Sequence, residues 1–378
     1  MEITDIDTYL LDNETGIQSI PTGSETVSID IRSVLAVVLT DEGMRGVGES
    51  FHHSADARNT LALARSVEGI GQQLIGKDPS PVRQHWHNLY DKVKRMNAYE
   101  ALSVLDQALW DLKGKQADCP VYQLLGGGVG DLRTYATFPH KKDDDELIEV
   151  GSRLNDCGFD AMKIIAGYGV ERDRERIETV ATDLPDGFGL AIDANTSYEF
   201  TDALVVAETA AENGLAWFEE PIAHTDIDGV AALRDRVSVP IAGYQTHTTH
   251  YPTRNHLQAG AYDIYQPAVY HGGGITSAFN VGTVVETFNK KLIPHAVGPA
   301  VNYAASVHVA AASPACSMIE FAVFDDELTD LGRFVASPYV TDQEKLNVTD
   351  GTVVPPEKPG LGITIDWDVI EDRQVADG

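Results

Sequence analysis

The chain has 378 residues and a net charge of −30 at pH 7, because 28 lysine and arginine residues face 58 aspartate and glutamate residues. A surface this negative repels nucleic acids and anionic membranes, so we expect neither as a partner. An anionic substrate would need a local positive group such as a metal ion or a buried cation, and the 43% hydrophobic content is enough for a large folded core.

The sequence also bears on where the protein works. Its apolar runs are shorter than the ~20 residues that span a bilayer, and MEITDIDTYLLD carries acids where a signal peptide carries cations. We therefore expect a soluble, cytoplasmic protein, and its acidity is typical of a halophile. Cys119, Cys157 and Cys316 lie far apart without a CxxC motif, so we expect neither a disulfide framework nor a zinc site.

The first 125 residues predict an α+β domain. Residues 3–11 and 32–40 are strand-like, and the turn-rich stretch between them, GIQSIPTGSE, predicts a loop. Three helical segments follow, over residues 56–75, 80–95 and 98–115.

Residues 126–325 show a repeat. Short apolar segments, about 23 to 29 residues apart, occur around residues 134, 162, 191, 217, 241, 264, 293 and 319. Helical stretches lie between them, which predicts a (β/α) barrel because parallel strands need crossovers that cover the sheet. An open doubly wound sheet is the alternative, but the first strand is not followed by GxGxxG. Residues 326–378 add proline- and glycine-rich turns, and we expect them to return to the N-terminal domain.

Polar residues stand at the ends of these segments, where barrels of this kind carry their active sites. They are Lys163, Asp193, Glu219, Glu220, Gln245, Gln266, His295 and Glu320. Asp193, Glu219 and Gln245 are separated by 26 residues each, so they occupy equivalent places on three adjacent strands. Converging oxygen ligands suit Mg²⁺. Each acid alone is equally typical of a strand end that meets water or caps the next helix.

Seven ordered motifs cover the chain from about residue 1 to 325. They are RSVLAVVLTDEGMRGVGES, ALSVLDQALWDLKGKQADCPVYQLLGG, GFDAMKI, IDANTSY, WFEEP, PIAG and QPAVYHGGGIT. This series resembles the mandelate racemase and muconate-lactonising branch of the enolase superfamily. The resemblance implies an α/β fold, a modified (β/α)7β TIM-like barrel with an α+β capping domain, that binds Mg²⁺ and removes the proton α to a carboxylate. It also implies a homo-oligomer, a dimer or an octamer.

The resemblance extends to the metal position. Asp193 and Glu219 match the first two metal ligands of the family, whereas Gln245 stands where the third ligand is normally glutamate. An amide oxygen can still coordinate Mg²⁺, but one formal negative charge is lost, so we expect weaker binding of the cation.

At the catalytic positions the match is incomplete. Lys163 matches the first lysine of the family's KxK motif, but the second, which usually abstracts the proton, is Ile165. His295 matches the acid/base histidine, and Ala268 stands where its aspartate partner is expected. His295 is thus expected to lack the carboxylate that would fix its tautomer and raise its basicity. Glu320 matches the acid on the eighth strand.

Several other residues are candidates for a relocated base or for contact with the substrate. The relocated base could be His247, Tyr244, His271 or His140, although each is also typical of a solvated or structurally hydrogen-bonded residue. The run IAGYQTHTTH is open to interpretation as a transition-metal site or simply as a polar loop. We expect the substrate to be bound by His52, His53, Asn195 and His247, with the loops at 16–26 and 50–55 deciding which acid is accepted.

Together with these residues, the resemblance implies a lyase that dehydrates a sugar acid, an aldonate or an aldarate, by β-elimination. A proton α to a carboxylate is weakly acidic, so a divalent cation must stabilise the enolate, with Lys163, His295 and Glu320 as catalytic groups. Racemisation, epimerisation or cycloisomerisation is the alternative, and it needs a base on each face of the substrate. The departures at Ile165, Gln245 and Ala268 leave open a third possibility, a non-catalytic or impaired relative that only binds.

Overall fold

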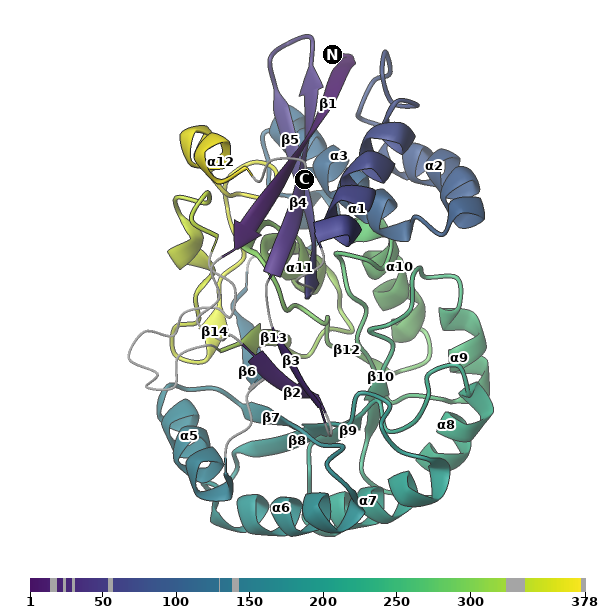
Figure 1. Cartoon of the computed structure of the whole chain (residues 1–378), viewed down its shortest axis with the longest axis vertical. Coiled ribbons are helices and arrows are strands. Elements are labelled where there is room, and N and C mark those ends of the chain that lie inside the picture. Colours follow the sequence, from purple (N-terminus) through teal and green to yellow (C-terminus); the bar gives the residue numbers. More distant parts are fainter. Residues whose placement is uncertain are drawn as a thin grey trace.

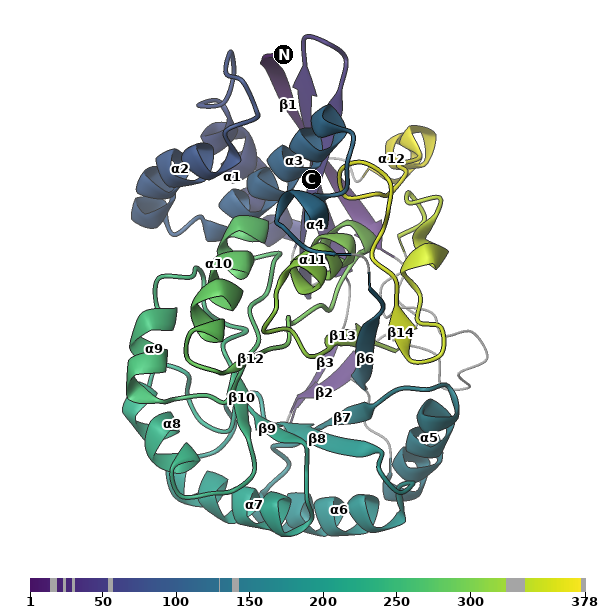
Figure 2. The ribbon, with the colours of Figure 1, turned by 180° about the vertical axis from the view of Figure 1, so that it is seen from behind.

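The computed structural model contains an antiparallel sheet with helices and a curled parallel sheet ringed by helices (Figures 1 and 2). It describes residues 1–13, 19–22, 25–28, 31–53, 57–128, 130–137, 143–323 and 337–374.

The capping sheet has the order β1-β4-β5, built from β1 (Ile3–Asn13), β4 (Ile31–Thr40) and β5 (Arg45–His53). Its central strand β4 is buried along almost its whole length, as expected for a β-branched and apolar strand between two partners. A short hairpin of β2 (Ser19–Thr22) and β3 (Glu25–Ser28) forms where the sequence predicted only a loop. The other residues between β1 and β4 lie outside the described ranges.

Three helices accompany this sheet: α1 (Ala57–Gly71) and α3 (Tyr99–Ala117), which cover it, and α2 (Val82–Met96), which packs on α3. They lie where the sequence predicted them. The helix α3 is buried on nearly all sides and lies directly on β5, because Gly46 and Gly48 have no side chains. A Cβ atom at Gly48 would lie 2.0 Å from the carbonyl oxygen of Val104. The short helix α4 (Val121–Leu124) then leads to the barrel.

Eight parallel strands follow within the described residues, in chain order around the sheet. They are β6 (Leu132–Thr137), β7 (Ala161–Ile165), β8 (Gly189–Asp193), β9 (Trp217–Glu219), β10 (Ile241–Gly243), β11 (Ile264–Tyr265), β12 (Lys291–Leu292) and β13 (Ile319–Ala322). β13 pairs with β6, and a bridge between Leu292 and Cys316 joins the other edge, which closes the barrel.

Seven helices alternate with these strands in the same part of the chain. They are α5 (Asp144–Asp156), α6 (Val170–Asp183), α7 (Phe200–Glu212), α8 (Ile227–Arg234), α9 (Thr253–Ala259), α10 (Gly274–Glu286) and α11 (Ala300–Ala312). The predicted (β/α)7β barrel with an α+β cap is thereby confirmed. The eight apolar segments in the sequence correspond one by one to the eight strands.

The interior of the barrel has two layers. The first is an apolar floor made of Tyr135, Ala161, Ala191, Trp217, Ala242, Ile264 and Ile293. Side chains two residues apart on a strand share a face. Two residues beyond most of these floor positions stand Thr137, Lys163, Asp193, Glu219, Gln266 and His295. The strand period therefore places a polar layer directly on the apolar floor, at the carboxyl ends of the strands.

The described C-terminal residues 337–374 run alongside both bodies (Figure 2). They contain a 3-10 turn (Gln343–Leu346), β14 (Thr352–Val353), which pairs antiparallel with β6, and α12 (Trp367–Arg373), which contacts β1. A further bridge joins Leu11 to Gln374.

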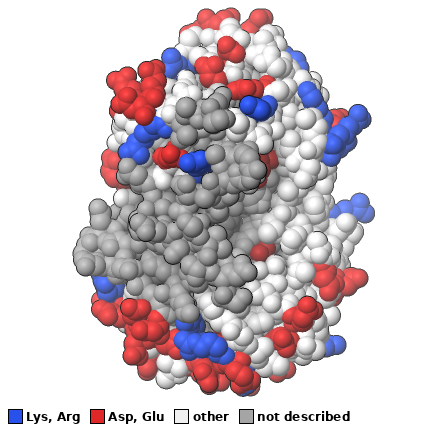
Figure 3. Space-filling view, in the orientation of Figure 1, with Lys and Arg blue, Asp and Glu red and all other residues white. Residues whose placement is uncertain are grey.

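The surface agrees with the acidic composition. Figure 3 shows acidic side chains gathered at both ends of the molecule, over the cap and over the far helices of the barrel. No helix in the described part of the chain has both the length and the apolar character of a membrane span. The three cysteines are all free thiols.

The cap is joined to the barrel by buried hydrogen bonds between α3 and the start of α10. The Asp106 carboxylate accepts bonds from the backbone N–H and the hydroxyl of Thr276, at 2.8 and 2.6 Å. The Trp110 indole donates to the same hydroxyl at 2.8 Å. Burial raises the pKa of Asp106 to about 7.

Replacing Asp106 by asparagine should remove part of the pH dependence of stability. The folded protein retains a proton on Asp106 that the unfolded chain releases near a pKa of about 4, so wild-type stability falls as the pH rises from about 4 to about 7. Over this pH range the wild type should lose a few kcal/mol more unfolding free energy than Asp106→Asn does, at about 1.4 kcal/mol per pKa unit. Denaturant unfolding at about pH 5 and about pH 8 measures it. An equal loss in both proteins would contradict a titrating Asp106.

Candidate active site

A buried ammonium lies at the centre of the polar layer. Lys163 Nζ donates to Glu219 Oε1 at 2.6 Å, and it lies 3.2 Å from Glu320 Oε1 and 3.4 Å from Asp193 Oδ2. Burial alone would lower the pKa of Lys163, but Glu219 and Glu320 outweigh it and hold that pKa well above its usual range. Lys163 is therefore a fixed positive charge.

Glu219 is held in one orientation by its neighbours. While Oε1 binds Lys163, Oε2 accepts from the Trp217 indole at 3.1 Å and from Gln266 Nε2 at 2.7 Å. Asp193 lies beside it, because these two residues are register partners in the parallel pair β8 and β9. The strand pairing thus brings the two carboxylates to one point.

The backbone is unusual where these strands end. Asn195, Glu220 and Tyr244 have positive φ angles of 45°, 40° and 98°. Such conformations cost residues other than glycine of the order of 1–3 kcal/mol and cluster at functional sites. The turn at Asn195 lets its backbone N–H donate to Asp193 Oδ1 at 2.8 Å, which orients the other oxygen of Asp193 towards Lys163.

The turn at Tyr244 determines how Gln245 is placed. Tyr244 bonds to the loop after β10, through Thr249 and Thr253, so the next residue enters the site. Gln245 Nε2 donates to Glu220 Oε2 at 3.0 Å, while its buried Oε1 has no hydrogen-bond partner. An unpaired buried acceptor of this kind is costly unless a ligand satisfies it.

The charges of this region fit a divalent cation. Asp193, Glu219 and Glu320 are buried around Lys163, and the buried Glu220 follows Glu219 in the chain. Burial and the charge of Glu219 raise the pKa of Asp193 well above its usual range, so ionising Asp193 beside Glu219 takes more positive charge than Lys163 supplies. Asp193, Glu219 and the free oxygen of Gln245 are the residues that could hold the cation. No group of three or more His, Cys, Asp or Glu side chains in the described ranges is arranged to hold a metal, so such a site would depend on the amide.

His295 has a carboxylate partner despite the alanine at position 268. Its Nδ1 atom lies 2.8 Å from Glu320 Oε2, in a close ion-pair contact whose angles fall short of a hydrogen bond. Burial alone would raise the pKa of Glu320, but Lys163 and His295 hold it well below its usual range. The expectation, drawn from Ala268, that His295 lacks a carboxylate partner is therefore wrong.

Glu320 is itself well anchored. Its Oε1 accepts from the Thr137 hydroxyl and its Oε2 from the backbone N–H of Ala296 at 3.0 Å. The Glu320 carboxylate thus lies between the ammonium group of Lys163 and the imidazole of His295.

The other predicted residues lie apart from this centre. His52, at the end of β5, contacts Glu100 with Nε2 to Oε2 at 2.8 Å. His247 packs against His224 and His256, with ring centroids 5.3 and 4.4 Å away, and burial lowers its pKa to about 3.

Two further candidates are not described. They are the side chain of His53 and the whole of His140. Ile165 is half-buried and aligned with Asp193, so an apolar side chain stands at this strand position.

Sequence reasoning assigned no role to three side chains that hold the site. Trp217 and Gln266 orient Glu219, and Thr137 orients Glu320. Gln266 was among the polar strand ends but had no role there, and the two-residue period from the apolar floor is the signal that could have identified Thr137. The contact of Trp217 with Glu219 depends on its rotamer and has no counterpart in the sequence pattern.

Two protein-family profiles match the chain. Residues 5–126 match the mandelate racemase / muconate lactonizing enzyme N-terminal domain, and residues 147–369 match the enolase C-terminal domain-like family. Strands β7 to β13 lie within the second match.

Known proteins resemble the chain along most of its length. It is 32% identical over 392 aligned residues to D-galactarolactone cycloisomerase from Agrobacterium fabrum, with 100% of both chains covered. It is 30% identical over 349 residues to arabinonate dehydratase from Saccharolobus solfataricus, with 90% of each covered. A crystal structure of an enolase from Bradyrhizobium complexed with magnesium and mandelic acid has a TM-score of 0.85 and 26% identity over 99% of each chain. The chain belongs to the enolase superfamily, in its mandelate racemase and muconate-lactonising branch.

Proposed function

We propose that the protein dehydrates a sugar acid by Mg²⁺-dependent β-elimination. The observation that carries the proposal is that one basic group, His295, is placed for proton transfer among the described residues of the polar layer. Lys163 is paired with three carboxylates and remains an ammonium, and Ile165 offers no base. A single base suits a reaction that removes and returns a proton on one side of the substrate.

The metal would be held by Asp193, Glu219 and Gln245. When bound, Mg²⁺ neutralises the negative charge that develops on the substrate carboxylate as the α proton leaves. The neighbour crystallised with magnesium and mandelic acid supports this choice of cation. Lys163 adds a second fixed positive charge beside the same carboxylates, which favours the transition state without any proton transfer of its own.

His295 would move the proton. Glu320 lies at Nδ1 and favours the tautomer with the proton there, which leaves Nε2 free to accept the α proton. The same imidazolium then protonates the hydroxyl that leaves from the β carbon. Water and an enol are released, and the enol becomes a 2-keto-3-deoxy acid. The side chain is 15% exposed, so it is accessible to a substrate above the polar layer.

Cycloisomerisation is the second candidate, since the relative at 32% identity is a cycloisomerase. Racemisation is less favoured, because it needs a base on the face where Ile165 stands. The third reading, a relative that only binds, predicts an intact site without proton transfer.

Turnover in D₂O should distinguish these reactions. The protein is incubated with Mg²⁺ and a panel of aldonic and aldaric acids, while NMR follows the α proton and semicarbazide traps keto acids. We expect a 2-keto acid from at least one of them. Exchange of the α proton without product would indicate racemase-like chemistry, and neither signal would favour the binding protein.

Replacing His295 by asparagine should lower kcat by about 10²–10⁴-fold with little change in KM. The variant keeps a polar side chain of similar reach but cannot transfer a proton. The substitution His247→Asn is the matched control, because His247 lies outside the polar layer, and it should retain activity. If only His247→Asn lost activity, the base would be His247 and not His295.

Replacing Gln245 by glutamate should have opposite effects with and without Mg²⁺. Without the cation, a carboxylate facing Glu220 lowers the melting temperature. With it, the added charge should tighten Mg²⁺ binding by about tenfold, as measured by calorimetry. The substitution Gln245→Ala removes the oxygen and should weaken binding. Wild-type affinity in both variants would place Gln245 outside the metal site.

A further inference from the structure

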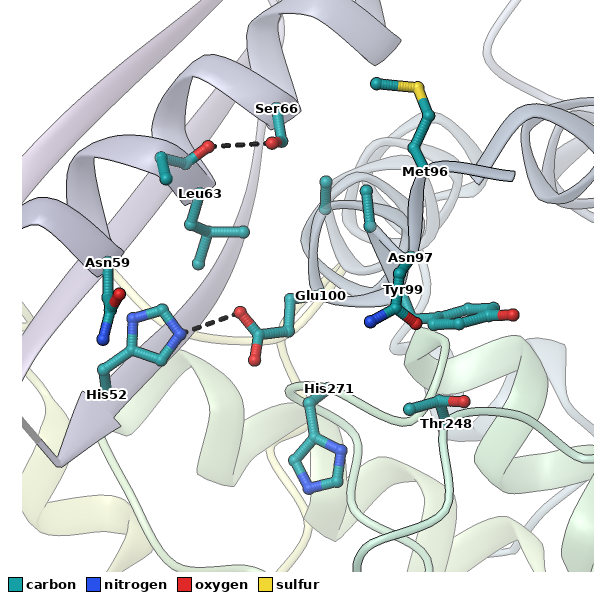
Figure 4. A pocket seen from close by; sticks show the side chains of 13 residues that line it. His52, Asn59, Leu63, Ser66, Met96, Asn97, Tyr99, Glu100, Thr248 and His271 are labelled. Atoms are coloured by element: carbon teal, nitrogen blue, oxygen red, sulfur yellow. Dashed lines mark hydrogen bonds and ion pairs between the residues drawn. The ribbon is translucent and has the colours of Figure 1, made fainter. Parts of the chain in front are cut away.

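A cavity of about 360 Å³ opens between the cap and the barrel loops. Figure 4 shows His52, Glu100, His271 and Thr248 around it, the first two from the cap and the last two from loops that follow β10 and β11. This volume is within the range of sites that hold small molecules. None of the residues assigned to proton transfer or metal binding lines it.

The charged group of this cavity is Glu100. Its Oε2 lies 2.8 Å from His52 Nε2, and its side chain remains 38% exposed. Burial alone would raise the pKa of Glu100, but the contact with His52 lowers it, so the carboxylate is ionised. Burial lowers the pKa of His271 to about 4, so His271 adds no positive charge at neutral pH.

The cavity adjoins the polar layer through a short chain of contacts. His271 follows Tyr270, whose ring lies 6.2 Å from the ring of His295 and 4.5 Å from that of Phe51, between centroids. Phe51 precedes His52 on β5. A Cβ atom at Gly298, three residues after His295, would lie 2.3 Å from Phe51. The same loops therefore line the base on one side and the cavity on the other.

We propose that Glu100 determines specificity by receiving the end of the substrate remote from the reacting carboxylate. A carboxylate accepts hydrogen bonds from hydroxyl groups and repels another carboxylate in a partly buried cavity. The substrate class is then the monocarboxylic polyhydroxy acids, the aldonates, and the dicarboxylic aldarates are excluded. This inference rests on the proposed function, since it assumes that the acid reacts beside His295.

Glu100 would select against dicarboxylic acids through one unfavourable contact, with their second carboxylate. A site that hydrogen-bonds a hydroxyl discriminates strongly against a substrate that lacks it, and a like charge adds repulsion. Asn97 and Tyr99 border the same cavity and can bond further hydroxyls without adding charge.

The test uses pairs of acids that differ only at the terminal carbon: galactonate with galactarate, gluconate with glucarate and mannonate with mannarate. Dissociation constants from calorimetry and kcat/KM are measured with Mg²⁺ for the wild type and for Glu100→Gln. For the pair that binds best, we expect the wild type to favour the monoacid by at least about tenfold. In the variant the monoacid should bind about tenfold more weakly and the diacid more tightly.

The control is Glu286→Gln, which removes an exposed acid from α10, outside the cavity, and should leave the ratio unchanged. A wild type that favours diacids, a ratio unaffected by Glu100→Gln, or no binding of any acid would overturn the inference. Binding with the expected ratio but without turnover would instead refute the proposed dehydratase and leave the role of Glu100 standing.

Discussion

The site depends on one buried ammonium among carboxylates. Lys163 offsets charge on three acids that come from β8, β9 and β13. Carboxylates this close and this deeply buried repel each other strongly, and such a group is stable only with a compensating cation. The acids cannot spread apart, because the register of the parallel strands fixes their backbone positions.

Glu320 illustrates how the barrel can replace a missing group from a neighbouring strand. The alanine at position 268 leaves His295 without the acid expected just after β11, and the acid of β13 lies at Nδ1 instead. One carboxylate then serves two functions, since it balances Lys163 and orients the histidine. A closed barrel makes this possible, because β13 lies next to the strand that precedes His295, while Lys163 reaches Glu320 from β7, on the other side of β6.

Much of the architecture could be predicted from the sequence, for a physical reason. A repeat of apolar segments with intervening helices has few stable solutions, and its period also located Lys163, Asp193, Glu219, His295 and Glu320 at equivalent strand ends. Contacts between side chains of different strands could not be predicted from this repeat. The approach of Glu320 to His295 and the orientation of the Gln245 amide towards Glu220 depend on rotamers and on positive φ angles. Neither rotamers nor positive φ angles can be read from the spacing of apolar residues.

The buried bonds between α3 and α10 have a consequence for access. Trp86 also donates its indole N–H to Gly273 at 2.7 Å, and the backbone N–H of Gly273 bonds to Ser103 at 2.8 Å. Swinging the whole cap away from the barrel would break these bonds together with those of Asp106 and expose the buried rings of Trp86 and Trp110 to water. Any substrate would therefore have to reach the interior while the two bodies stay docked, through movements of loops and side chains smaller than a domain hinge.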